Sequence, residues 1–352
     1  MSFVLNEEEQ MLRDSARSFL SETASVAALR KLRDEGTSIL YISHKLEEIR
    51  SLCEHATVLR LGKVVATCDP RQKSARELAE MMVGTTLQPP ARSTIPEGQT
   101  VLELRDLSLK SENLFGTSLK NVSVSLRRGE ILGIGGVAGN GQDELLAALS
   151  GEARSRRDSV ILEGKPIGHL GPLARRRLGL LAAPEERLGH AAAPDMSLTE
   201  NALLTGAVRE KLVKGGFVDW SGARAFADRV IERFDVRTPG AHVAARALSG
   251  GNLQKFVIGR EIMQRPGVLV VNQPTWGVDA SAAAAIRQAL IDLAENGAAV
   301  ILISQDLDEL FAIADRMAVI HEGHVSRIRP TGEWTREAVG LEMMGVAPQD
   351  AH

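Results

Sequence analysis

The sequence of 352 residues has little of several features that mark particular classes of protein. Its two cysteines, Cys53 and Cys68, are too few for a disulfide framework or a cysteine-based metal cluster, so a reducing compartment is expected. Aromatic residues make up 3% of the chain, which argues against stacking surfaces for nucleic-acid bases. No apolar run approaches the length of about 18 residues that spans a membrane.

The charge balance is nearly neutral, with 42 basic and 45 acidic residues and a net charge of −3. It gives no electrostatic footprint for nucleic acid, so no nucleic-acid partner is expected. The N-terminus carries acidic residues where a signal peptide would carry basic ones, which predicts a cytoplasmic protein. An apolar content of 44% is ample for a large core, and the length suggests about two domains.

An internal repeat is the main organising feature of the chain. Residues 36–84 match residues 297–345 without a gap, at an offset of 261 residues. Identical pairs include Ile42 and Ile303, Ser43 and Ser304, Leu46 and Leu307, Glu48 and Glu309, Val58 and Val319, Gly62 and Gly323, Val64 and Val325, and Met82 and Met343. We expect both copies to form a strand, a helix, a short strand, a glycine turn, a strand and a closing helix.

The strands that open the two copies are predicted at Ile39–Ser43 and Val300–Ser304, and the closing helices at Ser74–Val83 and Glu333–Met344. Residues 25–84 are thus the tail of one unit, and residues 100–346 are a complete second unit. A stretch rich in Pro, Thr and Ser, residues 85–99, is predicted to be the linker.

Residues 1–24 do not fit the repeat and predict an extra amphipathic helix with Asn6 as its N-cap. This segment resembles the opening helix of acyl-CoA dehydrogenases. A chance similarity and a fused or rearranged reading frame both remain open.

The second unit contains a glycine-rich loop, GVAGNGQD at residues 136–143, between a predicted strand and a predicted helix. Its frame is that of the phosphate-cradling loop, in which glycines let backbone N–H groups turn toward an anion. Gln142 stands where that loop has its Lys, and Asp143 where it has the Mg²⁺-binding Ser or Thr.

Four further motifs follow in a fixed order. They are LAAPEERLGH at residues 181–190, LSGGNLQK at residues 248–255, PGVLVVNQPTWGVD at residues 266–279 and ILISQ at residues 301–305. Ser249 is expected to cap the helix that follows it, and Gly250 and Gly251 would allow close approach to a phosphate.

This set of motifs resembles the ATP-binding-cassette (ABC) ATPases. LSGGNLQK resembles their signature, PGVLVVNQ their Walker B strand, Gly277–Asp279 their D-loop and Gln305 the position of their switch histidine, while Glu185 or Glu186 replaces the Q-loop glutamine. From about residue 25 onward the chain resembles the tandem ATPase subunits of importers for simple sugars and nucleosides. Residues 25–84 would be a remnant of the first cassette, with His44 at its switch position in a structural role, and residues 100–346 a degenerate second cassette.

The resemblance implies an α/β fold of the P-loop NTPase, ABC type. Its parts would be a central, mostly parallel sheet, an antiparallel β subdomain and a helical subdomain near residues 198–264. It also implies ATP and Mg²⁺ as cofactors, both weakly bound. The implied nucleotide-binding residues are Gly136, Gly139, Asn140, Gly141, Gln142, Asp143, Ser249, Gly250, Gly251, Asn252 and Asp279, and the weak Mg²⁺ candidates are Asp143 and Asn272.

The catalytic positions are all substituted, namely Gln142, Asn272, Gln273 and Gln305. Gln142 removes a cation that faces the phosphates, and Asp143 adds a negative charge. Two unit charges about 4 Å apart interact by roughly 4 kcal/mol at an effective dielectric of 20. Gln273 cannot act as a base. We therefore expect little or no ATP hydrolysis by this chain alone.

In ABC proteins ATP lies between the phosphate loop of one cassette and the signature of another. The intact signature therefore predicts a signature donor, working with another cassette that has an intact phosphate loop and with transmembrane permease subunits, on the inner face of the plasma membrane. The alternatives are a regulatory or interaction protein outside transport, and a non-functional rearranged fragment. The basic run Arg175–Arg177 is predicted to be a solvated helix end.

Overall fold

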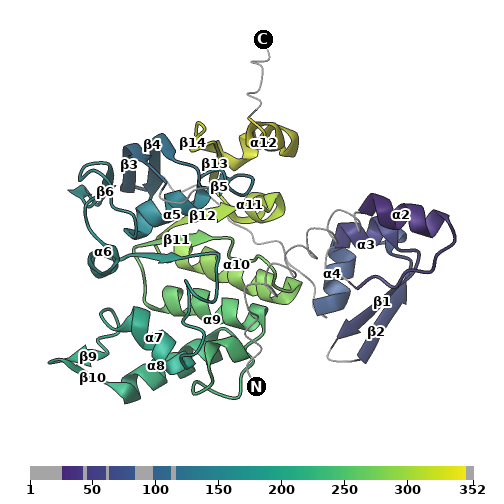
Figure 1. Cartoon of the computed structure of the whole chain (residues 1–352), viewed down its shortest axis with the longest axis horizontal. Helices are drawn as coiled ribbons and strands as arrows, with labels where there is room; N and C mark the ends of the chain where they lie inside the picture. The colour runs from purple at the N-terminus through teal and green to yellow at the C-terminus, as the bar shows by residue number, and fades with distance from the viewer. Residues whose placement is uncertain (1–25, 43–45, 61–62, 84–97, 112–115, 346–352) are drawn as a thin grey trace, which may run out of the picture. The chain divides into compact units, whose positions relative to one another are not determined.

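The computed structural model describes residues 26–42, 46–60, 63–83, 98–111 and 116–345 (Figure 1). The chain divides into two compact units, residues 1–88 and 89–352. The predicted helix over residues 1–24, most of the predicted linker and His44 lie outside the described residues.

The second unit is built on a central sheet with the strand order β14-β13-β5-β12-β11-β8, and β15 pairs with β13. Its strands are β5 (Ile131–Gly135), β8 (Leu180–Ala183), β11 (Val268–Asn272), β12 (Ala299–Ser304), β13 (Arg316–His321), β14 (His324–Val325) and β15 (Arg329–Pro330). All pairings among β5, β8, β11, β12 and β13 are parallel. The predicted parallel core is therefore confirmed.

Alternate residues of the central strands enter different hydrophobic cores. In β12, Val300 and Leu302 join one core, while Ile301 and Ile303 join the other. Because successive side chains of a strand point to opposite faces, a run of apolar residues needs cover on both sides. One face packs against α5 (Gln142–Ser150) and the antiparallel sheet.

That antiparallel sheet has the order β4-β3-β6-β7. Its strands are β3 (Thr100–Leu109), β4 (Leu119–Arg127), β6 (Val160–Leu162) and β7 (Lys165–Pro166). The other face of the central sheet is covered by helices, among them α10 (Ala280–Glu295), α11 (Leu307–Ile313) and α12 (Arg336–Met343). The short helix α6 (Pro172–Leu178) precedes β8, and the 3-10 turn η3 (Thr331–Glu333) precedes α12.

The helical subdomain consists of α7 (Leu198–Gly206), α8 (Trp220–Arg233) and α9 (Gly250–Met263). It also holds a 3-10 turn, η2 (Ala245–Ala247), and a small hairpin of β9 (Val213–Lys214) and β10 (Phe217–Val218) that the sequence did not predict. The apolar side of α8 is buried at Phe226 and Val230. The predicted location of this subdomain is confirmed, and Figure 1 shows its helices on the far side of α10 from the antiparallel sheet.

The first unit consists of α2 (Val26–Asp34), α3 (Leu46–Leu52), β1 (Ala56–Arg60), β2 (Lys63–Cys68), η1 (Pro70–Gln72) and α4 (Ala75–Val83). At the offset of 261 residues, α3 coincides with α11, η1 with η3, and the first residue of α4 with that of α12. The predicted strand at Ile39–Ser43 is wrong, since residues 39–42 are not a strand. In the second unit the matching strand β12 is paired on both sides, by β5 and β11.

Candidate functional site

The glycine-rich loop lies at the carboxyl end of β5 and leads into α5, as predicted. Gly139 and Gly141 have φ angles of +82° and +109°, which side-chain-bearing residues rarely adopt. A Cβ at Gly136 would lie 2.7 Å from Nε2 of Gln142 and 2.8 Å from the carbonyl oxygen of Ile320. The glycines are therefore required both by backbone geometry and by close packing.

Gln142, at the position of the phosphate-facing Lys, folds back on its own loop. Its Oε1 accepts a hydrogen bond from the Asn140 backbone N–H at 2.9 Å, and its Nε2 donates to the Val137 carbonyl at 2.7 Å. The residue is 6% exposed. A backbone N–H of the anion nest is thus bound to a neutral side chain of the same chain.

Asp143 and Asn272 are brought together, as the Mg²⁺ prediction required. The Asn272 Nδ2 donates to Oδ1 of Asp143 at 3.1 Å. Burial raises the pKa of Asp143, and the negative charge of Glu144 raises it further, whereas His190 and the bond from Asn272 oppose the shift. Burial and the charge of Asp143 also raise the pKa of Glu185, so this corner of the site is crowded with negative charge.

Gln273 and Gln305 form the second linked pair. The Gln305 backbone N–H donates to Oε1 of Gln273 at 3.3 Å. Gln273 has a φ of +51°, which is uncommon outside glycine. Because β12 lies between β5 and β11, the ends of these three strands bring the loop, Asn272, Gln273 and Gln305 to one edge of the sheet.

The resemblance implies two cofactors, ATP and Mg²⁺, and the residues of this site suit Mg²⁺ better than they suit the phosphates of ATP. The phosphate side does not fit as the loop stands, because Gln142 binds the Asn140 N–H and two acids lie close by. The metal side keeps two oxygen atoms, the Asp143 carboxylate and Oδ1 of Asn272, which is buried without a hydrogen-bond partner in the described structure. Mg²⁺ prefers oxygen ligands, so these residues would hold it, and it would neutralise phosphate charge when bound.

The signature lies at the start of α9. Ser249 occupies the N-cap position, but its side chain makes no capping bond, contrary to expectation. Instead its hydroxyl accepts from Nδ2 of Asn252 at 2.8 Å. A Cβ on Gly251 would lie 3.8 Å from Oδ2 of Asp279, so the signature approaches the D-loop of its own cassette. Asp279 itself caps α10 through the Ala282 N–H at 2.9 Å.

Arg187 connects the signature, the D-loop and the segment after β8, a role the sequence did not suggest. Its Nη2 donates to the carbonyl of Trp276, the residue before the D-loop. A Cβ added at Gly250 would lie 2.5 Å from its Nη1, and one at Gly277 would lie 3.0 Å from its Nη2. The glycines on both sides therefore make room for one guanidinium, which ties together segments that are distant in sequence.

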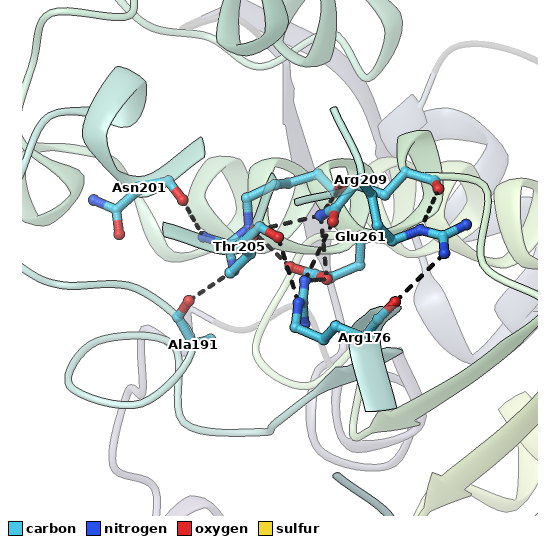
Figure 2. Close-up of polar contacts among 8 residues, drawn as sticks. Arg176, Ala191, Asn201, Thr205, Arg209 and Glu261 are labelled. Atoms are coloured by element: carbon cyan, nitrogen blue, oxygen red, sulfur yellow. Dashed lines mark hydrogen bonds and ion pairs between the residues drawn. The ribbon is translucent and has the colours of Figure 1, made fainter. Parts of the chain in front are cut away.

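A buried polar network anchors the helical subdomain to the rest of the cassette (Figure 2). Arg260 of α9 donates to the carbonyls of Asn201 at 3.0 Å and Ala191 at 2.8 Å, and its Nε to Glu261 at 3.0 Å. Arg176 of α6 donates to the other carboxylate oxygen of Glu261. Arg209 joins α6 to the end of α9 through the Arg176 and Gln264 carbonyls. Charge-assisted bonds of this kind are strong when buried, so the network fixes α9.

The prediction that Arg175–Arg177 is a solvated helix end is wrong for two of the three residues. Arg175 is fully buried and donates to the carbonyls of Ala148, Leu149, Gly168 and Leu170. Burial lowers its pKa to about 10. Arg176 belongs to the network in Figure 2. The reason is that unpaired carbonyls at the ends of helices and loops are costly to bury, and an arginine can bind several of them.

The sequence is similar to curated ATP-binding proteins of import systems. It is 38% identical over 323 residues to the glucose import ATP-binding protein TsgD13 of Haloferax volcanii, covering 90% of this chain and 58% of that protein. It is 36% identical to the nucleoside import ATP-binding protein NupA of Lactococcus lactis, covering 92% and 64%. It is 37% identical to the guanosine import ATP-binding protein NupO of Bacillus subtilis, covering 92% and 63%.

The fold is shared with solved cassettes at lower sequence identity. The MJ1267 cassette of an ABC transporter has a TM-score of 0.56 at 19% identity, covering 70% of this chain and 98% of that one. The MJ0796 cassette bound to ADP and Pi has a TM-score of 0.55 at 20% identity, covering 65% and 98%. These likenesses establish the cassette fold, the mixed α/β type with a parallel-sheet core.

The chain spans about six tenths of the length of these curated relatives. Within the part that the structure describes, every helix is too short or too polar to cross a membrane. The ABC transporter family model matches residues 119–276, which run from β4 through the loop and the signature to the end of the Walker B-like segment. The chain therefore contains an ABC transporter ATP-binding domain, and its homologues are ATP-binding proteins of sugar and nucleoside import.

Proposed function

We propose that this chain is the nucleotide-binding subunit of an ABC importer for simple sugars or nucleosides, in which its cassette does not hydrolyse ATP itself. It acts as a signature donor to a partner cassette that has an intact phosphate loop. The observation that supports this most is the contrast within one domain, where the signature is intact but the catalytic positions carry Gln142, Asn272, Gln273 and Gln305.

The geometry at the signature suits a role in trans. The start of α9 has no side-chain cap, so its first N–H groups and its positive dipole end can face an anion. The network of Figure 2 holds this helix against the rest of the cassette, so a phosphate would meet a fixed surface. A fixed surface loses little entropy when it binds.

The partners follow from the relatives. The relatives are named as ATP-binding proteins of glucose and nucleoside import. We propose that this chain works with transmembrane permease subunits and lies in the cytoplasm against the inner face of the plasma membrane. The resemblance of residues 25–84 to the tail of a first cassette supports a tandem arrangement with residues 100–346 as the second cassette. In this arrangement the permease and binding-protein subunits would select the importer's cargo.

The test measures phosphate release by this chain alone and by a mixture with a chain that carries an intact first cassette. We expect no significant release by this chain alone, and stimulation in the mixture. The stimulation should disappear in Ser249→Arg, which puts a bulky cation at the signature. Ser221→Arg is the matched control, because Ser221 is exposed near the start of another helix of the same subdomain.

Two results would contradict the proposal. One is robust hydrolysis by this chain alone, which would mean that the substituted loop is catalytic. The other is stimulation that survives Ser249→Arg in a folded protein, which would mean that the signature does not act in trans.

A further inference from the structure

We infer that Gln142 serves as a built-in substitute for phosphate, and that its carboxamide keeps anions out of the glycine-rich loop. The inference rests on the proposed function in one respect, that this loop is not catalytic. It goes further, since the loss of the Lys alone would weaken the affinity of the loop for anions but leave its backbone N–H groups free to bind them. Here the Gln142 carboxamide already occupies the N–H group of Asn140.

The carboxamide bridges two backbone groups of the loop, those of Val137 and Asn140. Its oxygen accepts from the Asn140 N–H at 2.9 Å, as a phosphate oxygen would, and its nitrogen donates to the Val137 carbonyl at 2.7 Å. A deprotonated phosphate oxygen can only accept a hydrogen bond, whereas an amide satisfies the N–H donor and the carbonyl acceptor at once. Gly136 leaves room for the amide, since a Cβ there would lie 2.7 Å from Nε2.

The loop is also tied to a neighbouring turn by one of its own residues, Asn140. Its Nδ2 donates to the same Val137 carbonyl at 2.9 Å, and its Oδ1 accepts from the Glu322 N–H at 2.9 Å. The Gly323 N–H in turn donates to the Asn140 carbonyl at 2.9 Å. The turn after β13 thus holds the loop in place from one side, and the Gln142 carboxamide holds it from within.

Truncation of Gln142 separates two causes of weak anion binding, namely occupation of the loop by the carboxamide and the missing positive charge. Gln142→Ala removes the carboxamide without adding a cation, so any gain in anion binding comes from the vacated N–H group. Gln142→Glu keeps an oxygen for the Asn140 N–H but loses the donor to Val137 and adds a negative charge. Gln142→Lys would change occupancy and charge together, so it cannot distinguish the two causes.

The experiment is isothermal titration of the full chain with pyrophosphate in the presence of Mg²⁺. We expect the wild type and Gln142→Glu to bind too weakly to reach saturation, and Gln142→Ala to bind saturably, at least tenfold more tightly than the limit that the wild-type titration sets. The melting temperature of Gln142→Ala should fall without ligand and rise with pyrophosphate, whereas that of the wild type should not respond. The tryptophans, all in the second unit, report whether the variant is folded.

A folded Gln142→Ala that binds pyrophosphate no better than the wild type would overturn the inference. A second measurement needs no variant, namely amide exchange of Asn140 in the wild type. We expect this amide to be protected without ligand and unchanged by pyrophosphate. Rapid exchange that pyrophosphate slows would overturn the inference as well.

The inference and the proposed function can fail separately. Pyrophosphate binding is measured without a partner cassette, while the signature-donor role is measured by stimulation of a partner. If the mixture showed no stimulation, the proposed function would fail, but the inference that Gln142 occupies the loop would still stand or fall on pyrophosphate binding.

Discussion

The two copies of the internal repeat carry the same pattern of residues but differ most at their opening segment. The helices match at the offset of 261 residues, so α3 and α11 have the same bounds in both copies. The segment that forms β12 in the second unit is not a strand at residues 39–42 of the first. Local interactions are enough to define the helices, whereas a central strand depends on its neighbours.

The difference is largest at an identical pair, Ile42 and Ile303. Ile303 is fully buried in β12 and pairs with β5 and β11, while Ile42 is 90% exposed. A buried strand of a parallel sheet satisfies its backbone groups only through such pairing. The first unit, whose described strands β1 and β2 form an antiparallel pair, offers this segment no such place.

The largest expected effect comes from the matched substitutions Ile303→Ala and Ile42→Ala. The first leaves a cavity in the core and should cost about 2–5 kcal/mol of unfolding free energy. The second removes an exposed side chain and should change it by less than about 0.5 kcal/mol. Urea denaturation separates the units, since all three tryptophans lie in the second unit and both cysteines in the first.

Tryptophan fluorescence would follow the second unit and thiol labelling the first. The proposed difference between the two copies would be contradicted if Ile42→Ala destabilises the first unit as much as Ile303→Ala destabilises the second. That result would mean that Ile42 is buried in solution and that its segment has found strand neighbours.

Much of the second unit could be predicted because its motifs are local and ordered along the chain. The loop at residues 136–143, the Walker B-like strand and the signature helix lie where the motif order placed them. The direction of a side chain could not be predicted in the same way. That Gln142 turns back onto Val137, and that Arg175 is buried among carbonyls, depends on which backbone groups the tertiary fold leaves unpaired.

The wrong strand prediction in the first unit also shows that tertiary contacts cannot be predicted from local sequence. Ile39–Ser43 has the composition of a buried strand, and composition alone cannot report whether neighbouring strands are present. The helices α3 and α4 were predicted without such information.

A second, smaller effect is expected at the identical pair Glu309 and Glu48. Glu309 is 1% exposed, and the Ser304 hydroxyl donates to one of its oxygens at 2.7 Å, while the other oxygen has no hydrogen-bond partner within the described residues. Burial raises the pKa of Glu309 above its ordinary value of 4.5. The folded state therefore holds this proton more tightly than the unfolded state does, and stability falls as pH rises from about 4.5 through the folded pKa.

Glu309→Gln should remove that slope and stabilise the second unit above the folded pKa, because a neutral amide replaces a buried charge. The desolvation penalty of a buried polar group, about 1–3 kcal/mol, sets the scale of this gain. Urea denaturation followed by tryptophan fluorescence between pH 4.5 and 8 measures it. Glu48→Gln, followed by thiol labelling of the first unit, is the control, since Glu48 is half-buried and accepts from the Tyr41 hydroxyl. A pH profile of Glu309→Gln that parallels the wild type would contradict the prediction.

The smallest effect is expected where the copies differ in sequence, at Glu77 and its counterpart Ala338. In α4 the Glu77 carboxylate accepts from the Ser74 N–H at 2.8 Å and from Nζ of Lys73 at 3.0 Å. These bonds, the Ser74 N–H first, lower the pKa of Glu77 from 4.5 to about 2. At the start of α12 the Ala338 N–H is capped by the Thr335 hydroxyl at 3.1 Å, without a carboxylate.

A carboxylate whose folded pKa is lowered contributes stability that is present above the unfolded pKa and is lost as pH falls through the folded pKa. The first unit should therefore lose stability between about pH 4.5 and 2 through Glu77, and Glu77→Gln should flatten that window. The change is small because the carboxylate faces solvent, where ion pairs are screened. Labelling of Cys53 and Cys68 with a dipyridyl disulfide, which reacts in acid, would follow unfolding in urea across this range. Ala338→Gln should leave the tryptophan-monitored profile unchanged, and an acid profile that is the same in Glu77→Gln and the wild type would show that the capping carboxylate does not distinguish the two copies.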